Sequence, residues 1–249
     1  MSKASGKNRT SKAGYKNVQK NNNEDQYKSV LDMMIGEINV KPKTLNQKNF
    51  LKIINSNEVI VCTGPAGTGK TFLAASEALK LLKKNESPFK KIVLVKSVTQ
   101  LKGEDLGFLK GDVDTKMAPI MYSFMANFHK IIGNKMSDQL VEQGFVEVLP
   151  LSFIRGMSLD NSIIIVDEAQ NISMDNMKTI LTRIGYNSKM IIIGDTKQVD
   201  ISNKKDSSLQ FLTDKFKEVN GFGVMSFEKS DQVRNPIINA IEEIFEQEG

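Results

Sequence analysis

The stretch of sequence that decides the fold reads Gly64-Pro65-Ala66-Gly67-Thr68-Gly69-Lys70-Thr71. Its spacing, G-x-x-x-x-G-K-T, is that of a phosphate-binding loop, and it stands between an apolar run at 59–62 and helical spacing from Phe72. Glycines let successive backbone N–H groups point at phosphate oxygens, and the following helix adds its N-terminal partial positive charge. We therefore expect residues 64–71 to bind the phosphates of a nucleotide. Lys70 would reach the β- and γ-phosphates, and Thr71 would offer its hydroxyl to Mg²⁺.

An apolar run at 163–166 ends directly in two acids, Asp167 and Glu168. A strand that is apolar throughout is typical of a parallel sheet buried on both faces. At the carboxyl end of such a strand, Asp167 is expected to lie beside Mg²⁺ together with Thr71. Glu168 is expected to accept a proton from an attacking water. An acidic turn is the alternative interpretation, but the phosphate loop upstream favours the metal and base roles.

Further apolar runs alternate with segments of helical spacing. Strands are expected at 92–95, 145–148, 190–193 and 223–227. Helices are expected at 26–36, after Thr44 through Ile54, and at 72–82, 115–132, 173–183, 207–217 and 237–246. This alternation predicts an α/β fold, a three-layer sandwich around a mostly parallel sheet.

Several polar residues flank these elements and are candidates for the same site. Gln47 lies about one helix upstream of the loop, where its amide could read an adenine edge or could simply be solvated. Gln198 follows the strand expected at 190–193, where an amide can sense the γ-phosphate or hold the attacking water. Lys96 and Lys102 follow the strand expected at 92–95 and would contact phosphate or nucleic acid, or only solvent.

The basic charge of the chain is concentrated at its start. The formal net charge is +5, but residues 1–20 hold six Lys and Arg and no acid, so the remainder is near neutral. With almost no apolar residues to bury, residues 1–25 are expected to form a disordered basic tail before one domain at 26–249. Because no secretion signal or membrane-spanning run is present and Cys62 is the single cysteine, we expect a soluble intracellular protein without membrane contact.

Seven segments resemble, in order and spacing, the motifs of the PhoH family of P-loop ATPases. They are GPAGTGKT, LGFLKGD (106–112), FIRG (153–156), IIIVDEAQN (163–171), LTRIGYNSK (181–189), GDTKQVD (194–200) and QVRNP (232–236). The resemblance covers roughly residues 42–246. It departs at Lys96-Ser97, where many members of the family have Arg-Pro; Lys lacks the bidentate fork of Arg, so a strong phosphate or nucleic-acid contact there is in doubt.

The resemblance implies a RecA-like core, similar to the first domain of superfamily-one helicases, that binds and hydrolyses ATP with Mg²⁺ and works on RNA or single-stranded DNA. It implies adenine reading by Gln47 and a link between ATP state and nucleic acid through Gln198. It also implies that Arg234 faces the γ-phosphate. The short family core and the Asn- and Lys-rich composition suit the cytoplasm of a bacterial cell or a phage-infected host.

Two other classes of function compete with an ATPase. A nucleotide-dependent switch with little turnover is the main alternative, but a switch needs no base, so Glu168 favours the enzyme. A small-molecule kinase is disfavoured by the acids at 167–168 and by Gln198. Superfamily-one helicases, which the family resembles, place ATP between two RecA-like domains. Since this chain has room for one, the other wall of the site is expected to come from a neighbouring subunit in a ring, such as a hexamer, or to be absent. Arg183 and Arg155 are the candidates for an arginine acting in trans, with surface ion pairs as the alternative.

Overall fold

The computed structural model describes residues 29–96, 113–199, 207–235 and positions 237, 238, 241 and 244, with the side chains of 113–121 and 152 excepted. The expected tail at 1–25, Lys102 and the segment 106–112 lie outside the described residues. Within the described ranges, residues 29–34 are helical, inside the helix predicted at 26–36. None of the described helices combines the length and apolar character needed to cross a membrane.

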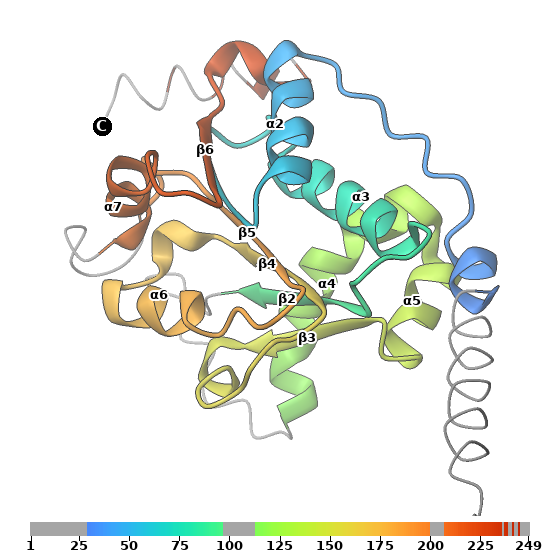
Figure 1. The fold of residues 1–249 in the computed structure, drawn as a ribbon. Coiled ribbons are helices and arrows are strands. Elements are labelled where there is room, and N and C mark those ends of the chain that lie inside the picture. The colour runs from blue at the N-terminus through green and yellow to red at the C-terminus, as the bar shows by residue number, and fades with distance from the viewer. Residues whose placement is uncertain are drawn as a thin grey trace, which may run out of the picture.

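Six parallel strands form one sheet at the centre of the molecule (Figure 1). Their order across the sheet is β3-β2-β4-β5-β1-β6. The strands are β1 (Val59–Thr63), β2 (Lys91–Lys96), β3 (Val146–Pro150), β4 (Ser162–Asp167), β5 (Lys189–Gly194) and β6 (Phe222–Ser226). Because all six run the same way, the phosphate loop after β1 and the acids at the end of β4 lie at the same edge, with β5 between them.

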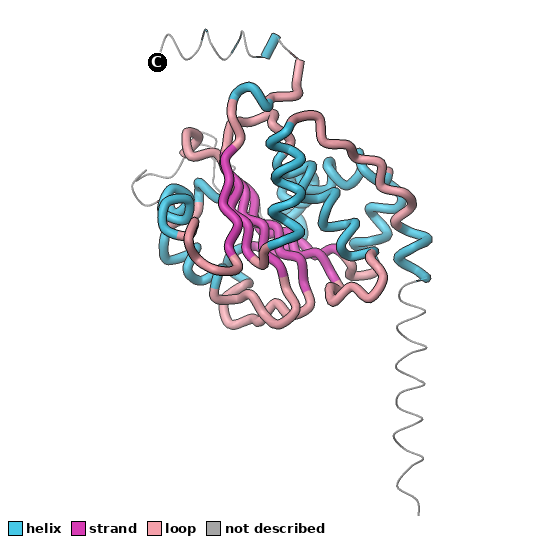
Figure 2. The backbone as a smooth tube through the Cα atoms, turned by 45° about the horizontal axis from the view of Figure 1, so that its top comes forward, coloured by secondary structure: helices cyan, strands magenta, loops and turns pink. Residues whose placement is uncertain are grey.

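Helices cover both faces of this sheet, as Figure 2 shows. On one face lie α2 (Leu45–Ser56), α3 (Lys70–Lys83), α4 (Val113–Ile132) and α5 (Asn134–Glu142). On the other face lie α6 (Met174–Leu181) and α7 (Ser208–Lys215). Side chains that alternate along each strand feed two separate cores: in β1, Ile60 and Cys62 join the first, and Val59 and Val61 the second.

The architecture confirms the predicted three-layer α/β fold, with a wholly rather than mostly parallel sheet among the described strands. The bounds of most predicted elements differ from the observed ones by one or two residues, and two differences have a clear physical cause. Helix α3 begins at Lys70, two residues before the apolar spacing starts, because its first turn points polar side chains into a pocket rather than the core. Helix α5 was not predicted, since Leu140 is the one apolar side chain among its buried residues and gives almost no helical period.

Candidate functional site

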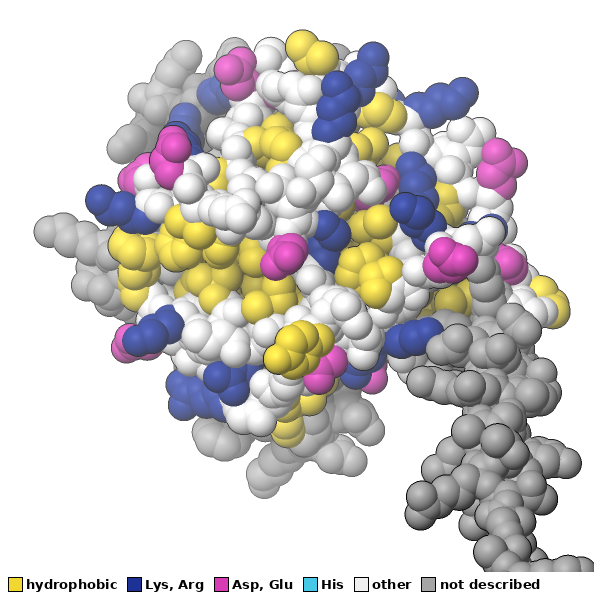
Figure 3. All heavy atoms as spheres, in the orientation of Figure 1, with side chains coloured by type: hydrophobic (Ala, Val, Ile, Leu, Met, Phe, Trp, Pro, Cys, Tyr) yellow, Lys and Arg dark blue, Asp and Glu magenta, His cyan; other side chains and the backbone are white. Residues whose placement is uncertain are grey.

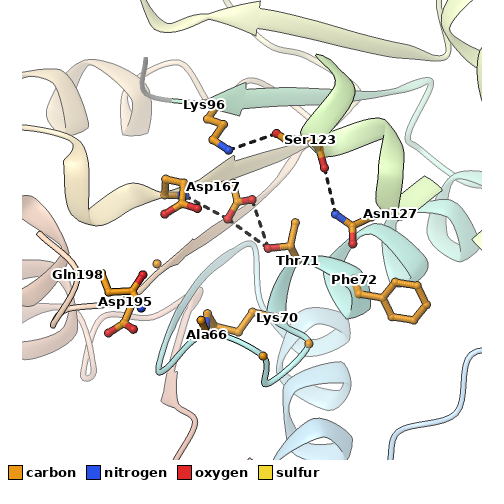
Figure 4. A pocket seen from close by; sticks show the side chains of 14 residues that line it. Ala66, Lys70, Thr71, Phe72, Lys96, Ser123, Asn127, Asp167, Asp195 and Gln198 are labelled. Atoms are coloured by element: carbon orange, nitrogen blue, oxygen red, sulfur yellow. Dashed lines mark hydrogen bonds between the residues drawn. The ribbon is translucent and has the colours of Figure 1, made fainter. Parts of the chain in front are cut away.

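A pocket of about 370 Å³ opens at the carboxyl edge of the sheet. The phosphate loop and the first turn of α3 form one wall, the ends of β2, β4 and β5 form the floor, and α4 closes one side. Figure 4 shows the side chains that line it. The lining brings together most of the predicted site residues: Ala66, Gly67, Gly69, Lys70, Thr71, Asp167, Glu168 and Gln198.

The loop itself is held in a tight curl. Gly64, Gly67 and Gly69 have φ angles of 136°, 80° and 84°, a region that only glycine adopts without strain. The Thr68 hydroxyl donates to the Pro65 carbonyl at 3.0 Å, which closes the turn. The glycine pattern of the sequence is thus needed for the backbone path.

Lys70 is buried at the centre of this loop. Its Nζ donates to the carbonyls of Gly64 at 2.7 Å and Pro65 at 2.8 Å. Burial lowers the pKa of the ammonium, and the Cys62 thiol and three acids, at 195, 167 and 168, act in the opposite direction. The structure therefore places the positive charge of Lys70 in a poorly solvated position surrounded by acids.

Thr71 and Asp167 form the pair expected for a metal. The Thr71 hydroxyl lies 3.2 and 3.3 Å from the two carboxylate oxygens of Asp167 (Figure 4). Burial, with a smaller contribution from Glu168, raises the pKa of Asp167 to about 6, while Lys96 and hydrogen bonds act against this shift. A hydroxyl and a carboxylate side by side are the hard oxygen ligands that Mg²⁺ prefers, so these residues fit the ion.

Glu168 takes an unusual backbone conformation, with a φ of 53°. Its carboxylate accepts a hydrogen bond from Gln170 Nε2 at 2.7 Å, and Gln170 Oε1 accepts one from the Asp195 N–H at 3.1 Å. Gln170 is buried in the short 3₁₀ helix Ala169–Asn171. Sequence reasoning assigned Gln170 no role, although it stands inside the motif that carries the acids; its contacts show that it orients the predicted base.

Three further predicted residues lie around the loop. Gln198 is exposed at the rim of the pocket, and its N–H donates to the Asp195 carbonyl at 3.1 Å. Arg234 packs on Gly67, since a Cβ built on that glycine would come within 2.6 Å of the Arg234 Cδ. Gln47 is buried, and its Nε2 donates to the Thr68 carbonyl at 3.0 Å. Adenine reading by Gln47 and γ-phosphate contact by Arg234 stay predictions.

Lys96 lies on the far wall of the pocket from the loop. It sits beside Asp167 in the register of β2 and β4, and its Nζ donates to Ser123 Oγ of α4 at 3.2 Å (Figure 4). Asn127, one helical turn further along α4, also lines the pocket. Lys96 thus contributes positive charge next to the acids.

Arg183 and Arg155 lie away from the pocket lining. Arg183 follows α6 and precedes β5, so it is at the amino edge of the sheet, where Nη1 donates to the Met157 carbonyl at 3.4 Å. Arg155 Nη2 donates to Asn176 Oδ1 on α6 at 3.3 Å. Neither arginine belongs to the pocket that its own subunit forms.

The family model and two relatives that this chain resembles share one description, PhoH-like protein. A family model described as PhoH-like protein matches residues 39–246. A PhoH-like protein of Synechocystis sp. is 40% identical over 212 residues, which cover 85% of this chain and 63% of that protein. A PhoH-like protein of Bacillus subtilis is 35% identical over 210 residues, 84% of this chain and 65% of that one. This chain therefore spans just under two thirds of both relatives.

A more distant likeness is to a solved structure. The crystal structure of Bacteroides sp Pif1 in complex with ADP-AlF4 aligns with 81% of this chain and 45% of that chain. The TM-score is 0.39 and the sequence identity is 16%.

Proposed function

Because this chain belongs to the PhoH family, we propose that it is a Mg²⁺-dependent ATPase whose site is the pocket around the phosphate loop. The observation that carries the proposal is the contact of Thr71 with Asp167, at 3.2 and 3.3 Å, in one pocket with Lys70 and Glu168. A phosphate loop, a metal pair and a base in one pocket are the groups that ATP hydrolysis needs.

Each residue has a distinct part in this proposal. The N–H groups of the loop and the N-terminus of α3 bind phosphate oxygens, and Lys70 neutralises charge on the β- and γ-phosphates. Thr71 and Asp167 would hold Mg²⁺, which would supply charge stabilisation to the phosphates. Glu168, oriented by Gln170, accepts the proton of the attacking water.

Two further residues act on the γ-phosphate. Gln198 stands at the rim of the pocket, where its amide orients the water or senses the γ-phosphate. Arg234 stabilises the charge that develops in the transition state, in cis. Arg234 packs on Gly67 of the phosphate loop without lining the pocket, so this role rests on the resemblance of the segment 232–236 to the family motif.

The coupled substrate in this proposal is RNA or single-stranded DNA. Support comes from the six basic residues of the segment 1–20. The test is ATP turnover with and without each nucleic acid, and then after deletion of 1–20. Stimulation by one of them, and weaker binding with a flatter salt dependence after the deletion, support the coupling. Tight ATP binding without turnover in any condition would favour the switch instead.

We also propose that the active form is a ring, in which a neighbouring subunit covers the open side of the pocket. Arg183 is the first candidate for an arginine acting in trans, because it lies at the sheet edge opposite its own pocket, where its alternative role is the contact with the Met157 carbonyl. Arg155 is the second candidate. Apolar side chains gather on the side of the molecule where α6 and α7 lie (Figure 3), and the Phe216 ring packs 6.1 Å from Phe211 and 4.7 Å from Phe222. Such a patch suits a subunit contact.

Mixing two inactive chains tests the ring. If Lys70→Ala and Arg183→Ala chains are combined, mixed rings contain some sites with both residues intact and regain ATPase activity. The same mixture with Arg155→Ala examines the second candidate. A chain that is monomeric by light scattering with ATP present, yet hydrolyses ATP at full rate, contradicts the ring and the trans arginine together.

A further inference from the structure

The phosphate loop is held from its outer side, away from the pocket. The carbonyls of residues 66–68 each accept one hydrogen bond from another part of the chain. The donors, in order, are Gln232 Nε2, the Val233 N–H and Gln47 Nε2, each at 3.0 Å. Two of these three donors come from the segment 231–234, which begins at the last residue of the short 3₁₀ helix Lys229–Asp231 and carries Arg234.

These contacts determine where the loop N–H groups point. In a trans peptide the C=O of one residue and the N–H of the next point in opposite directions. Holding the carbonyls of 66, 67 and 68 outward therefore holds the N–H groups of 67, 68 and 69 toward the pocket. Donors that are already aligned need no reorganisation when an anion binds.

Gly67 supports the view that this packing is built into the sequence. The phosphate-loop spacing requires glycine at 64 and 69, but leaves position 67 open. A Cβ at Gly67 would come within 2.6 Å of Arg234 Cδ and 2.9 Å of its Nε, so the Arg234 side chain would have to move off the loop. A glycine at 67 thus lets the segment 231–234 lie directly on the loop.

Asp231 fastens this segment to a second element. Its Oδ2 accepts hydrogen bonds from Asn46 Nδ2 at 2.7 Å and from the Glu228 N–H at 3.0 Å, and its side chain is buried. Although burial opposes ionisation, the hydrogen bonds from Asn46, Glu228 and Thr44 lower the pKa of Asp231. The carboxylate therefore ties the start of α2, with Gln47, to the segment that carries Gln232.

We propose that Gln232 is a positioning residue, which fixes the phosphate loop from outside so that its N–H groups face the nucleotide before binding. This inference rests on the proposed nucleotide site and adds to it a residue that does not touch the nucleotide. Gln232 acts on the part of the loop that both ADP and ATP contact, whereas Arg234 acts on the γ-phosphate. The two residues therefore differ in which nucleotide they affect.

The test replaces the donor without shortening the side chain. Gln232→Met keeps the length of the side chain but cannot donate a hydrogen bond. The matched control is Gln210→Met. Gln210 is exposed on α7, an element distant in sequence from the phosphate loop, and it donates to Asp214 of the same helix at 2.9 Å. Calorimetry measures ADP affinity, and hydrogen exchange of the peptide spanning 64–71 measures the loop in nucleotide-free protein.

We expect Gln232→Met to weaken ADP about fivefold to tenfold, the change that one lost hydrogen bond corresponds to, and to speed exchange in the loop. Gln210→Met changes neither quantity. Arg234→Ala weakens a non-hydrolysable ATP analogue more than ADP. If Gln232→Met unfolds the protein, which fast exchange throughout the sheet would show, ADP affinity and loop exchange are measured on Asn46→Ala instead. That variant breaks the contact with Asp231 and is expected to give a smaller change of the same sign.

Two results overturn the inference while leaving the site in place: ADP affinity within about twofold of wild type, or loop exchange that does not change. An equal effect from Gln210→Met also overturns it. Failure of the proposed function looks different, because neither wild type nor Lys70→Ala would then bind ADP. In that case the faster loop exchange of Gln232→Met has no consequence for binding, and the inference fails with the function.

Discussion

The two sides of the phosphate loop are built from different kinds of group. The inner side carries charges: Lys70, whose pKa burial lowers, and Asp167, whose pKa burial raises to about 6. The outer side carries neutral donors from Gln232, Val233 and Gln47, each matched to one loop carbonyl at 3.0 Å. The charges on the inner side are thus poorly solvated without a ligand, whereas each of these three carbonyls on the outer side already has a hydrogen-bond donor.

This difference separates what the loop binds from what keeps it in shape. Charges that are poorly solvated gain most from a ligand of opposite sign, so the inner side favours a phosphate chain with its metal ion. Satisfied neutral hydrogen bonds gain nothing from a ligand, so the outer side holds the backbone in one conformation. Substitutions on the inner side should change chemistry and charge, and those on the outer side should change affinity without changing the reaction.

Removing the inner positive charge should have the largest effect. Lys70→Ala is expected to weaken ATP and ADP at least about a hundredfold, because the phosphates lose a buried charged donor. Titration calorimetry measures the affinity. Lys80→Ala on the same helix, where Lys80 pairs with Glu77 at 3.5 Å, is the control and should bind normally. If Lys70→Ala binds ATP and ADP as tightly as wild type, the charge on the inner side of the loop does not contribute to nucleotide binding.

Neutralising the inner acid should stabilise the nucleotide-free protein. The pKa of Asp167 is raised in the fold to about 6, so the ionised carboxylate is unfavourable above that pH. Asp167→Asn, measured without Mg²⁺, should raise the free energy of unfolding by about 3 kcal/mol near pH 8. The gain should fade as the pH falls from about 6 to about 4, where both states of the wild type bind the proton.

Denaturant unfolding at pH 8 and at about pH 4 measures the difference in the free energy of unfolding between Asp167→Asn and wild type. Asp214→Asn, on the surface of α7, serves as the control and should leave stability nearly unchanged. A loss of stability in Asp167→Asn at pH 8 would show that the ionised carboxylate is stabilised in the fold. The inner side of the loop would then not be electrostatically unfavourable without a ligand.

A substitution on the outer side should have a smaller effect. Gly67→Ala should weaken ADP about tenfold, since the new Cβ displaces Arg234 and the loop hydrogen bonds beside it. Gly144→Ala is the control: its φ is 74°, close to the 80° of Gly67, but no atom lies within 4 Å of the added Cβ. Both variants carry the strain of a left-handed residue, so ADP calorimetry isolates the contact with the segment 231–234. Equal affinities in the two variants would mean that this contact does not matter.

Much of the inner side could be predicted from sequence, because charge and glycine spacing are local. The motif of 64–71 and the acids at 167–168 each follow an apolar run, and parallel strands bring their carboxyl ends to one edge. The order of the sheet could not be predicted in this way. Nothing local in residues 189–194 indicates that β5 lies between β1 and β4.

The outer side escaped prediction for a related reason. Gln232 and Ala66 are 166 residues apart, and an amide that meets a carbonyl leaves no pattern in sequence. Gln170 was missed similarly, because its partner Asp195 is brought near by the neighbouring strand β5. The extra glycine at 67 was the available signal, and its meaning depends on knowing that Arg234 lies above it.

The most direct test of the proposed ATPase activity is Mg²⁺-dependent phosphate release from ATP by wild type and by Glu168→Gln, with ADP affinity measured on the same preparations. Glutamine keeps the shape of the side chain but cannot take a proton. We predict that wild type hydrolyses ATP, that Glu168→Gln does so at least about a hundredfold more slowly, and that both bind ADP equally. Unchanged phosphate release by Glu168→Gln, or none by wild type despite tight binding of ATP, would contradict the account.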